Sequence, residues 1–79
     1  MRMRKKPPTR LRVQLGKAIR ALRNDQRISL RKFGLMTGMD YQYISLIERG
    51  QANASVDALE KIASGLGVEV RDLFNQAAE

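Results

Sequence analysis

The chain has 79 residues, and its 15 Lys and Arg against eight Asp and Glu give a formal net charge of +7 at pH 7. A chain of this length forms one small domain. The sequence has no Cys and no His, which excludes disulfide frameworks, zinc fingers, thiolate nucleophiles and imidazole bases. No apolar run approaches the roughly 20 residues of a membrane span, and no apolar segment follows the basic start. We therefore expect a cytoplasmic protein that is not an enzyme, with no cofactor and no metal site.

The positive charge is concentrated toward the amino terminus. Residues 1–12 carry a net +6, residues 13–49 carry +4 and residues 50–79 carry −3. A chain that is positive at one end and negative at the other is suited to contact with a polyanion. Nucleic acid is the first candidate partner and an anionic membrane surface the second. No wide face of bulky aromatics backs the basic residues, which argues against the membrane.

The amino-terminal segment 1–9 is predicted to be a flexible basic arm, since Pro7 and Pro8 disfavour helix before them. The arm either follows DNA phosphates or enters a minor groove, or it is a solubilising tail. The basic residues expected to act with the arm are Arg2, Arg4, Lys5 and Lys6 within it and Arg10 directly after it.

Residues 10–79 are predicted to fold as one all-α domain of five short helices. Ser, Thr or Asp stands at four expected helix starts, and Gly38, Gly50 and Gly67 stand where helices should end. The expected caps are Thr9, Ser29, Asp40 (for a helix from Tyr41 to Arg49) and Ser55. The apolar residues expected to face inward are Leu11, Leu15, Ala18, Ile19, Leu22, Ile44, Ile47, Val56, Leu59, Ile62, Ala63 and Leu66.

The stretch 30–49 meets the physical requirements of a helix-turn-helix. Two short helices that cross steeply need a small residue at the crossing, which Gly34 supplies, and a turn residue with positive φ, which Gly38 supplies. Ile44 and Ile47 then anchor the second helix and leave its other face free.

The chain resembles the phage-repressor-type (Cro and xenobiotic-response-element) helix-turn-helix DNA-binding family, and among its members the small restriction–modification controller proteins. The matching segments are LGKAIRALR at 15–23, IS at 28–29, YISLIERGQANAS at 43–55 and LEKIASGLGVEVRDLF at 59–74. The resemblance implies a compact, five-helix, lambda-repressor-like domain whose third helix lies in the major groove of double-stranded DNA.

The resemblance also implies which side chains contact DNA. Tyr41, Gln42, Ser45 and Leu46 stand at positions that face base edges, and the Gln42 amide suits adenine. The alternative for Gln42 and Leu46 is a solvated outer helix face.

Backbone contacts are implied for Ser29, Arg31, Tyr43 and Asn53. Tyr43 has the alternative of half-buried packing, and Asn53 that of a simple turn residue. The family usually has Gln where this chain has Leu30, so we do not expect Leu30 to contact DNA and expect Arg31 to compensate.

Two further features follow from the resemblance. Arg23 and Glu48 are expected to form a partly buried structural ion pair between the first and third helices. Val68, Val70, Leu73 and Phe74 are expected to supply a homodimer interface, although Glu69 stands where relatives have a Ser or Asp cap.

The predicted function is a sequence-specific, DNA-binding transcriptional regulator, by default a repressor, that binds a pseudo-palindromic operator as a homodimer. No small-molecule pocket is evident. The alternative is an antitoxin-like interaction module that mainly binds a partner protein, although the residues from Gly67 to Glu79 leave little chain for wrapping a toxin.

Overall fold

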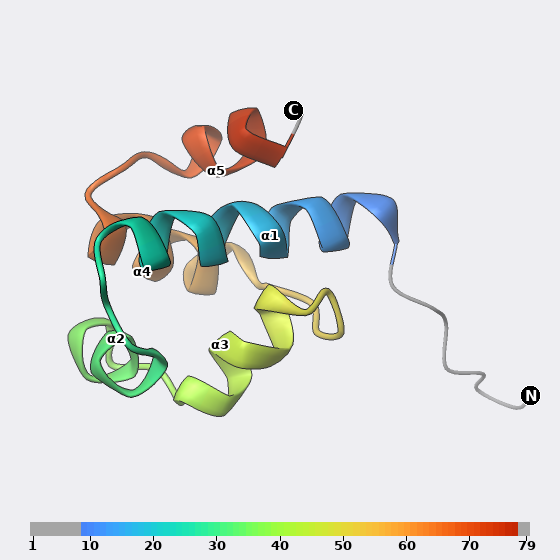
Figure 1. Cartoon of the computed structure of the whole chain (residues 1–79). Coiled ribbons are helices and arrows are strands. Elements are labelled where there is room, and N and C mark those ends of the chain that lie inside the picture. Colours follow the sequence, from blue (N-terminus) through green and yellow to red (C-terminus); the bar gives the residue numbers. More distant parts are fainter. Residues whose placement is uncertain (1–8, 78–79) are drawn as a thin grey trace, which may run out of the picture.

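The computed structural model describes residues 9–77, and within that range the chain forms five helices and no strand (Figure 1). The helices are α1 (Arg10–Asp25), α2 (Leu30–Thr37), α3 (Tyr41–Glu48), α4 (Val56–Leu66) and α5 (Val70–Ala77). The predicted all-α, five-helix fold is confirmed. No helix in residues 9–77 is both long and apolar enough to pass through a membrane.

Four helices begin at the caps that the sequence predicts, because a side-chain oxygen there accepts a bond from a main-chain N–H that has no partner within the helix. The bonds run from Arg12 N–H to Thr9 Oγ1 (3.1 Å), Lys32 N–H to Ser29 Oγ (3.1 Å), Gln42 N–H to Asp40 Oδ1 (2.8 Å) and Ala58 N–H to Ser55 Oγ (3.0 Å).

The start of α5 is secured differently. Glu69 precedes the helix, and its main-chain N–H donates to Oδ2 of Asp72, 2.9 Å away. In a capping box, the side chain of the third helical residue accepts a hydrogen bond from the main-chain N–H of the cap residue. Asp72, the third residue of α5, accepts such a bond from Glu69. The missing Ser or Asp at position 69 is offset by this bond.

Helix α1 lies across the middle of the fold, with α5 on one side and α3 on the other (Figure 1). Helix α2 packs against α3 and α4, which completes the helix-turn-helix. The apolar faces of all five helices meet in one cluster, which consists of Leu15, Ile19, Ile28, Phe33, Ile44, Ile47, Leu59, Ile62, Ala63, Leu66 and Leu73.

The turn between α2 and α3 depends on two glycines in the predicted roles. Gly38 has φ of +72°, the left-handed conformation that ends α2. A Cβ on Gly34 would lie 2.8 Å from the carbonyl oxygen of Met39 and 3.2 Å from the Cβ of Tyr41. The two helices can therefore cross this closely only with glycine at position 34.

Two apolar residues expected to face inward do not. Leu11 is 55% exposed and Val56 is 70% exposed. Both stand in the first turn of their helices, and in Figure 1 the amino-terminal end of α1 extends past α5. The spacing of apolar residues predicts which side of a helix faces the core. It does not predict how much of that side the neighbouring helices cover. Helix α3 also ends one residue early, at Glu48.

Candidate nucleic-acid interface

Helix α3 divides cleanly into a buried and an outer face. Ile44 and Ile47 are buried to 1% exposure or less, whereas Gln42 is exposed and Leu46 is 37% exposed. Because residues four apart share a helix face, Gln42 and Leu46 lie together on the outer side. Tyr41 and Ser45 lie beside them, each half-buried. The structure thus brings the four predicted readout residues onto the outer side of α3.

The first turn of α2 lies beside the first turn of α3. Ser29 uses its hydroxyl oxygen as the helix cap, so its hydroxyl proton stays free to donate. The guanidinium carbon of Arg31 lies 5.1 Å from the centre of the Tyr41 ring, a cation–π contact. Leu30, which replaces the expected Gln, packs against the core.

The loop after α3 is tied back to that helix. The Tyr43 hydroxyl donates to the main-chain carbonyl of Asn53 at 2.7 Å, and the Tyr43 ring packs against the core. A phenol has one proton to donate, so in this arrangement Tyr43 has none for a phosphate oxygen. Tyr43 therefore fits the half-buried alternative and positions the loop. Asn53 is exposed, and among residues 9–75 its side-chain amide has no hydrogen-bond partner.

Arg23 and Glu48 meet between α1 and α3. Arg23 donates from Nε and NH2 to the two Glu48 carboxylate oxygens, at 2.7 and 2.9 Å, and from NH1 to the carbonyl of Ile28 at 2.7 Å. Both residues are buried, at 7% and 8% exposure. The pair faces the protein interior and holds the loop before α2 as well as the two helices.

Of the five basic residues predicted to act with the arm, only Arg10 lies within the described residues. Arg2, Arg4, Lys5 and Lys6 lie outside the described residues. Arg10 is wrongly grouped with the arm, because it is the first residue of α1. The Thr9 side chain caps the helix at that point, so the helical conformation already includes Arg10.

One of the four residues expected at a dimer interface is not on the surface. Leu73 has no exposed area and belongs to the core, so it cannot contact a second copy. Val68, Val70 and Phe74 pack against the core from outside and are half-buried. An apolar residue needed for the core has the same sequence signature as one needed for an interface.

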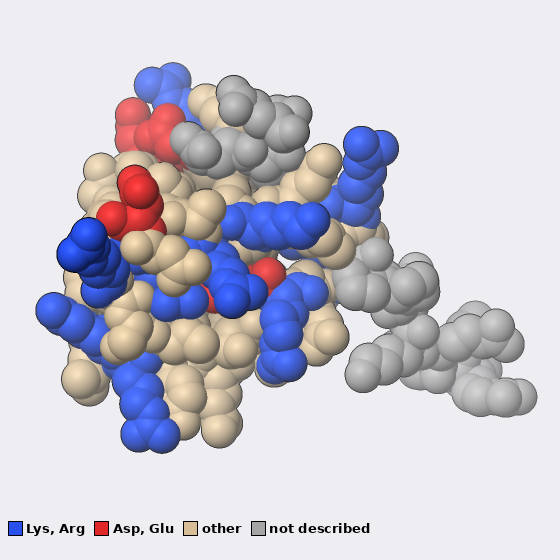
Figure 2. Space-filling view, in the orientation of Figure 1, with Lys and Arg blue, Asp and Glu red and all other residues tan. Residues whose placement is uncertain are grey.

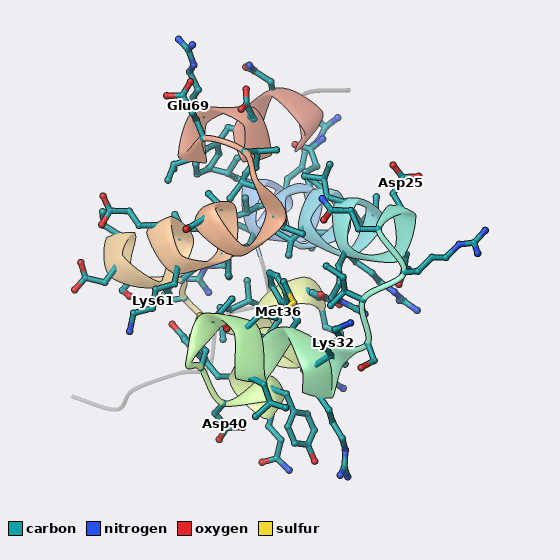
Figure 3. The ribbon with its side chains drawn as sticks, turned by 90° about the vertical axis from the view of Figure 1, so that its left-hand side faces the viewer. Asp25, Lys32, Met36, Asp40, Lys61 and Glu69 are labelled. Carbon is teal, nitrogen blue, oxygen red and sulfur yellow. The ribbon has the colours of Figure 1, made fainter. Side chains whose placement is uncertain are left out.

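Two exposed cations in the helix-turn-helix region are not among the predicted site residues. Arg49 caps the carboxyl end of α3, and Lys32 lies in the first turn of α2. Figure 3 shows Lys32 and Asp40 at the opposite end of the molecule from Glu69. The sequence could have indicated both residues, because Lys32 closely follows the predicted cap Ser29 and Arg49 directly precedes Gly50, where the helix is predicted to end.

The surface charge follows the same division. Figure 2 shows Lys and Arg side chains along α1 and over the lower part of the molecule, where α2 and α3 lie. Most acidic atoms visible on that face gather at the upper left, toward α5 and the carboxyl end of α1. A polyanion would be attracted to the α2–α3 end.

Comparison with known proteins gives the same picture. A family model described as "Helix-turn-helix" matches residues 19–73. The chain is 33% identical to the control protein C.MunI of a Mycoplasma species, and the match covers 82% of this chain and 89% of that one. It is 36% identical to the control protein C.BamHI of Bacillus amyloliquefaciens, with 82% of each chain covered. Other relatives are named HTH-type transcriptional regulators.

A solved structure resembles most of the helical part. The restriction-modification controller protein C.AhdI from Aeromonas hydrophila superposes with a TM-score of 0.75 at 34% identity, which covers 77% of this chain and 92% of that chain. The predicted resemblance to controller proteins is confirmed.

Proposed function

Since the chain belongs to the helix-turn-helix family of DNA-binding transcriptional regulators, we propose that it binds a pseudo-palindromic operator as a homodimer, with α3 in the major groove. The observation that carries the proposal is the division of α3. Two isoleucines anchor the helix in the core, and the side chains of Gln42 and Leu46 stand on the opposite side, free to meet base edges. Its relatives are regulators and not enzymes, and we propose no catalytic role and a cytoplasmic site of action.

Gln42 is the residue proposed to read a base most directly. Its side-chain amide offers a donor and an acceptor, the pair that adenine N6 and N7 require. Leu46 adds an apolar contact to a thymine methyl, and Ser45 can donate or accept at a neighbouring base. These three side chains lie along the outer side of α3, so the bases they contact are neighbours in one half-site.

Phosphate contacts are proposed to fix the helix in its groove. Ser29 has a free hydroxyl proton at the start of α2, where the main-chain N–H groups and the helix dipole favour an anion. The side-chain amide of Asn53, in the loop that Tyr43 holds, has no hydrogen-bond partner among residues 9–75. Arg49 at the carboxyl end of α3 and Lys32 in the first turn of α2 add exposed positive charge to the same two helices.

A second copy is proposed to contact the side of the molecule around α5. Val68, Val70 and Phe74 retain partial exposure there, and in Figure 1 α1 separates α5 from α3. A two-fold dimer through this side would leave both copies of α3 free.

The test is selection of bound duplexes from a random-sequence pool at about 150 mM salt, which suppresses non-specific binding to phosphates. We expect a two-fold symmetric motif whose half-sites are centred about one helical turn, roughly 34 Å, apart. An extra half turn of DNA between the half-sites should abolish high affinity. The Gln42→Ala variant should lose the preference at one base pair while the other positions stay selective.

Each other outcome has a defined meaning. A motif without symmetry would reject the dimer and keep the regulator. Failure to enrich any sequence, together with co-purification of a stoichiometric partner protein, would favour the antitoxin-like alternative.

A further inference from the structure

The contact of Arg31 with Tyr41 joins two residues to which the family resemblance gives separate roles, a base contact for Tyr41 and a backbone contact for Arg31. Arg31 is in the first turn of α2 and Tyr41 is the first residue of α3. Their 5.1 Å separation is within the roughly 6 Å at which a cation is attracted to an aromatic face. The guanidinium of Arg31 is therefore held over the start of the helix that enters the groove, although Arg31 is on the other helix.

A guanidinium over an aromatic face uses no N–H donor in that contact, because the attraction is between its positive charge and the electrons of the ring. Arg31 is exposed, and among residues 9–75 it has no ion-pair partner and no side-chain hydrogen bond. Arg23, by contrast, uses its donors on Glu48 and Ile28. The donors of Arg31 are thus available to an acceptor outside the protein.

We propose that Arg31, held on the Tyr41 ring, reads a guanine in the operator half-site. The proposal rests on the proposed function, because it requires α3 in the major groove. In that groove guanine presents two acceptors, O6 and N7, and the planar fork of an arginine matches them both. Tyr41 acts as a positioning residue, since its ring orients the fork and reduces the rotational freedom that the fork would lose on binding.

The position of Arg31 in the first turn of α2 would by itself favour a phosphate contact. A phosphate contact and a guanine contact predict different effects on DNA binding. An arginine on a phosphate strengthens binding to every sequence equally and steepens the dependence of affinity on salt. An arginine on a guanine strengthens binding only where that guanine is present. The stack favours the second role, because it directs the side chain toward α3.

The experiment starts from the duplex that the random-sequence selection yields with the full chain. Each guanine of the half-site is replaced in turn by 7-deazaguanine, which lacks the N7 acceptor. We expect one of these replacements to weaken binding of the unaltered protein about tenfold. The Arg31→Ala variant should bind the normal and the 7-deazaguanine duplexes equally, and selection with it should recover any base at that position.

Three variants separate the stack from simple charge. Tyr41→Phe keeps the ring and should keep the guanine preference, whereas Tyr41→Leu removes the ring and should reduce that preference several-fold. Lys32→Ala removes one positive charge from the neighbouring residue of α2 and should leave the preference at every base unchanged. Tyr41 and Lys32 both lie outside the buried core, and circular dichroism would confirm that each variant is folded.

Two results would overturn the inference without touching the proposed function. The first is an Arg31→Ala variant that keeps every base preference and loses affinity uniformly, with a shallower salt dependence, which would make Arg31 a phosphate contact. The second is a Tyr41→Leu variant with undiminished guanine preference, which would make the ring irrelevant. Failure of the unaltered protein to select any sequence would instead reject the proposed function itself.

Discussion

Arg23 and Glu48 form a two-point ion pair that is buried between α1 and α3, with Nε–Oε2 and NH2–Oε1 distances of 2.7 and 2.9 Å. The third guanidinium nitrogen of Arg23, NH1, donates to the carbonyl of Ile28, and no buried side-chain nitrogen or oxygen within residues 9–75 lacks a partner. The position of α3, and with it the whole outer face proposed to contact DNA, depends on a charge pair that cannot itself contact DNA.

Replacing Glu48 by Gln should destabilise the fold by about 3–5 kcal/mol, because Arg23 would remain buried without a counter-charge. A domain of this length has a total free energy of unfolding of about 4–12 kcal/mol, so much of the margin would be lost. Urea unfolding followed by circular dichroism measures the change.

The matched control is a double variant in which Arg23→Met and Glu48→Leu remove both charges. An apolar pair needs no counter-charge, so this variant should recover much of the lost stability. If Glu48→Gln alone leaves the urea midpoint unchanged but abolishes DNA binding, Glu48 has a role at the interface and the structural assignment is wrong.

Gly16 should not tolerate even a methyl group. A Cβ there would lie 2.3 Å from the carbonyl oxygen of Glu48 and 2.5 Å from that of Ile47, and main-chain atoms cannot rotate away. Replacing a helical glycine by alanine normally stabilises by about 0.5–1 kcal/mol. Here we expect Gly16→Ala to destabilise by about 1–3 kcal/mol, since α1 and α3 must separate. Lys17→Ala, at the exposed neighbouring position, should change thermal stability little, and an equally small effect at Gly16 would contradict the contact.

Features that depend on neighbouring residues are the ones that the sequence predicts well. The caps at Thr9, Ser29, Asp40 and Ser55 need only an acceptor two or three residues before a free N–H. The glycine stop at Gly38 likewise reflects a local conformation. The outer face of α3 follows from the spacing of its two buried isoleucines.

Features that depend on how helices cross are the ones that the sequence misses. Gly16 is tight only because carbonyl groups of α3 approach it, and the Arg31–Tyr41 stack exists only because the first turns of α2 and α3 meet. The sequence wrongly predicts Leu73 at an interface, because burial within one chain and burial between two chains favour the same residue type.

Replacing Tyr43 by Phe should loosen the loop of residues 51–54. The change removes the 2.7 Å bond to the Asn53 carbonyl and should cost about 0.5–1.5 kcal/mol, toward the lower end because the bond is exposed. We expect faster amide hydrogen exchange in this loop and weaker DNA binding, with base preferences unchanged. Tyr41→Phe is the control that should leave the exchange unaltered. If DNA binding weakens while amide hydrogen exchange in the loop stays the same, Tyr43 contacts a phosphate directly instead of positioning the loop.

A variant without the basic residues at the amino terminus tests whether this segment is a DNA-binding arm or a solubilising tail. The residues to replace are Arg2, Arg4, Lys5 and Lys6. Replacing all four by Gln in the full chain leaves the Thr9 cap in place, so the thermal stability of the helical domain should stay the same. Each phosphate that the arm neutralises adds about 0.9 to the slope of log affinity against log salt, so the slope should become shallower by up to about 3.6 for each copy of the chain that is bound. Filter binding or fluorescence anisotropy at several salt concentrations measures it. An unchanged slope, together with lower solubility of the variant, would show that the arm serves solubility. Loss of selectivity at AT-rich positions that flank the half-sites would instead place the arm in the minor groove.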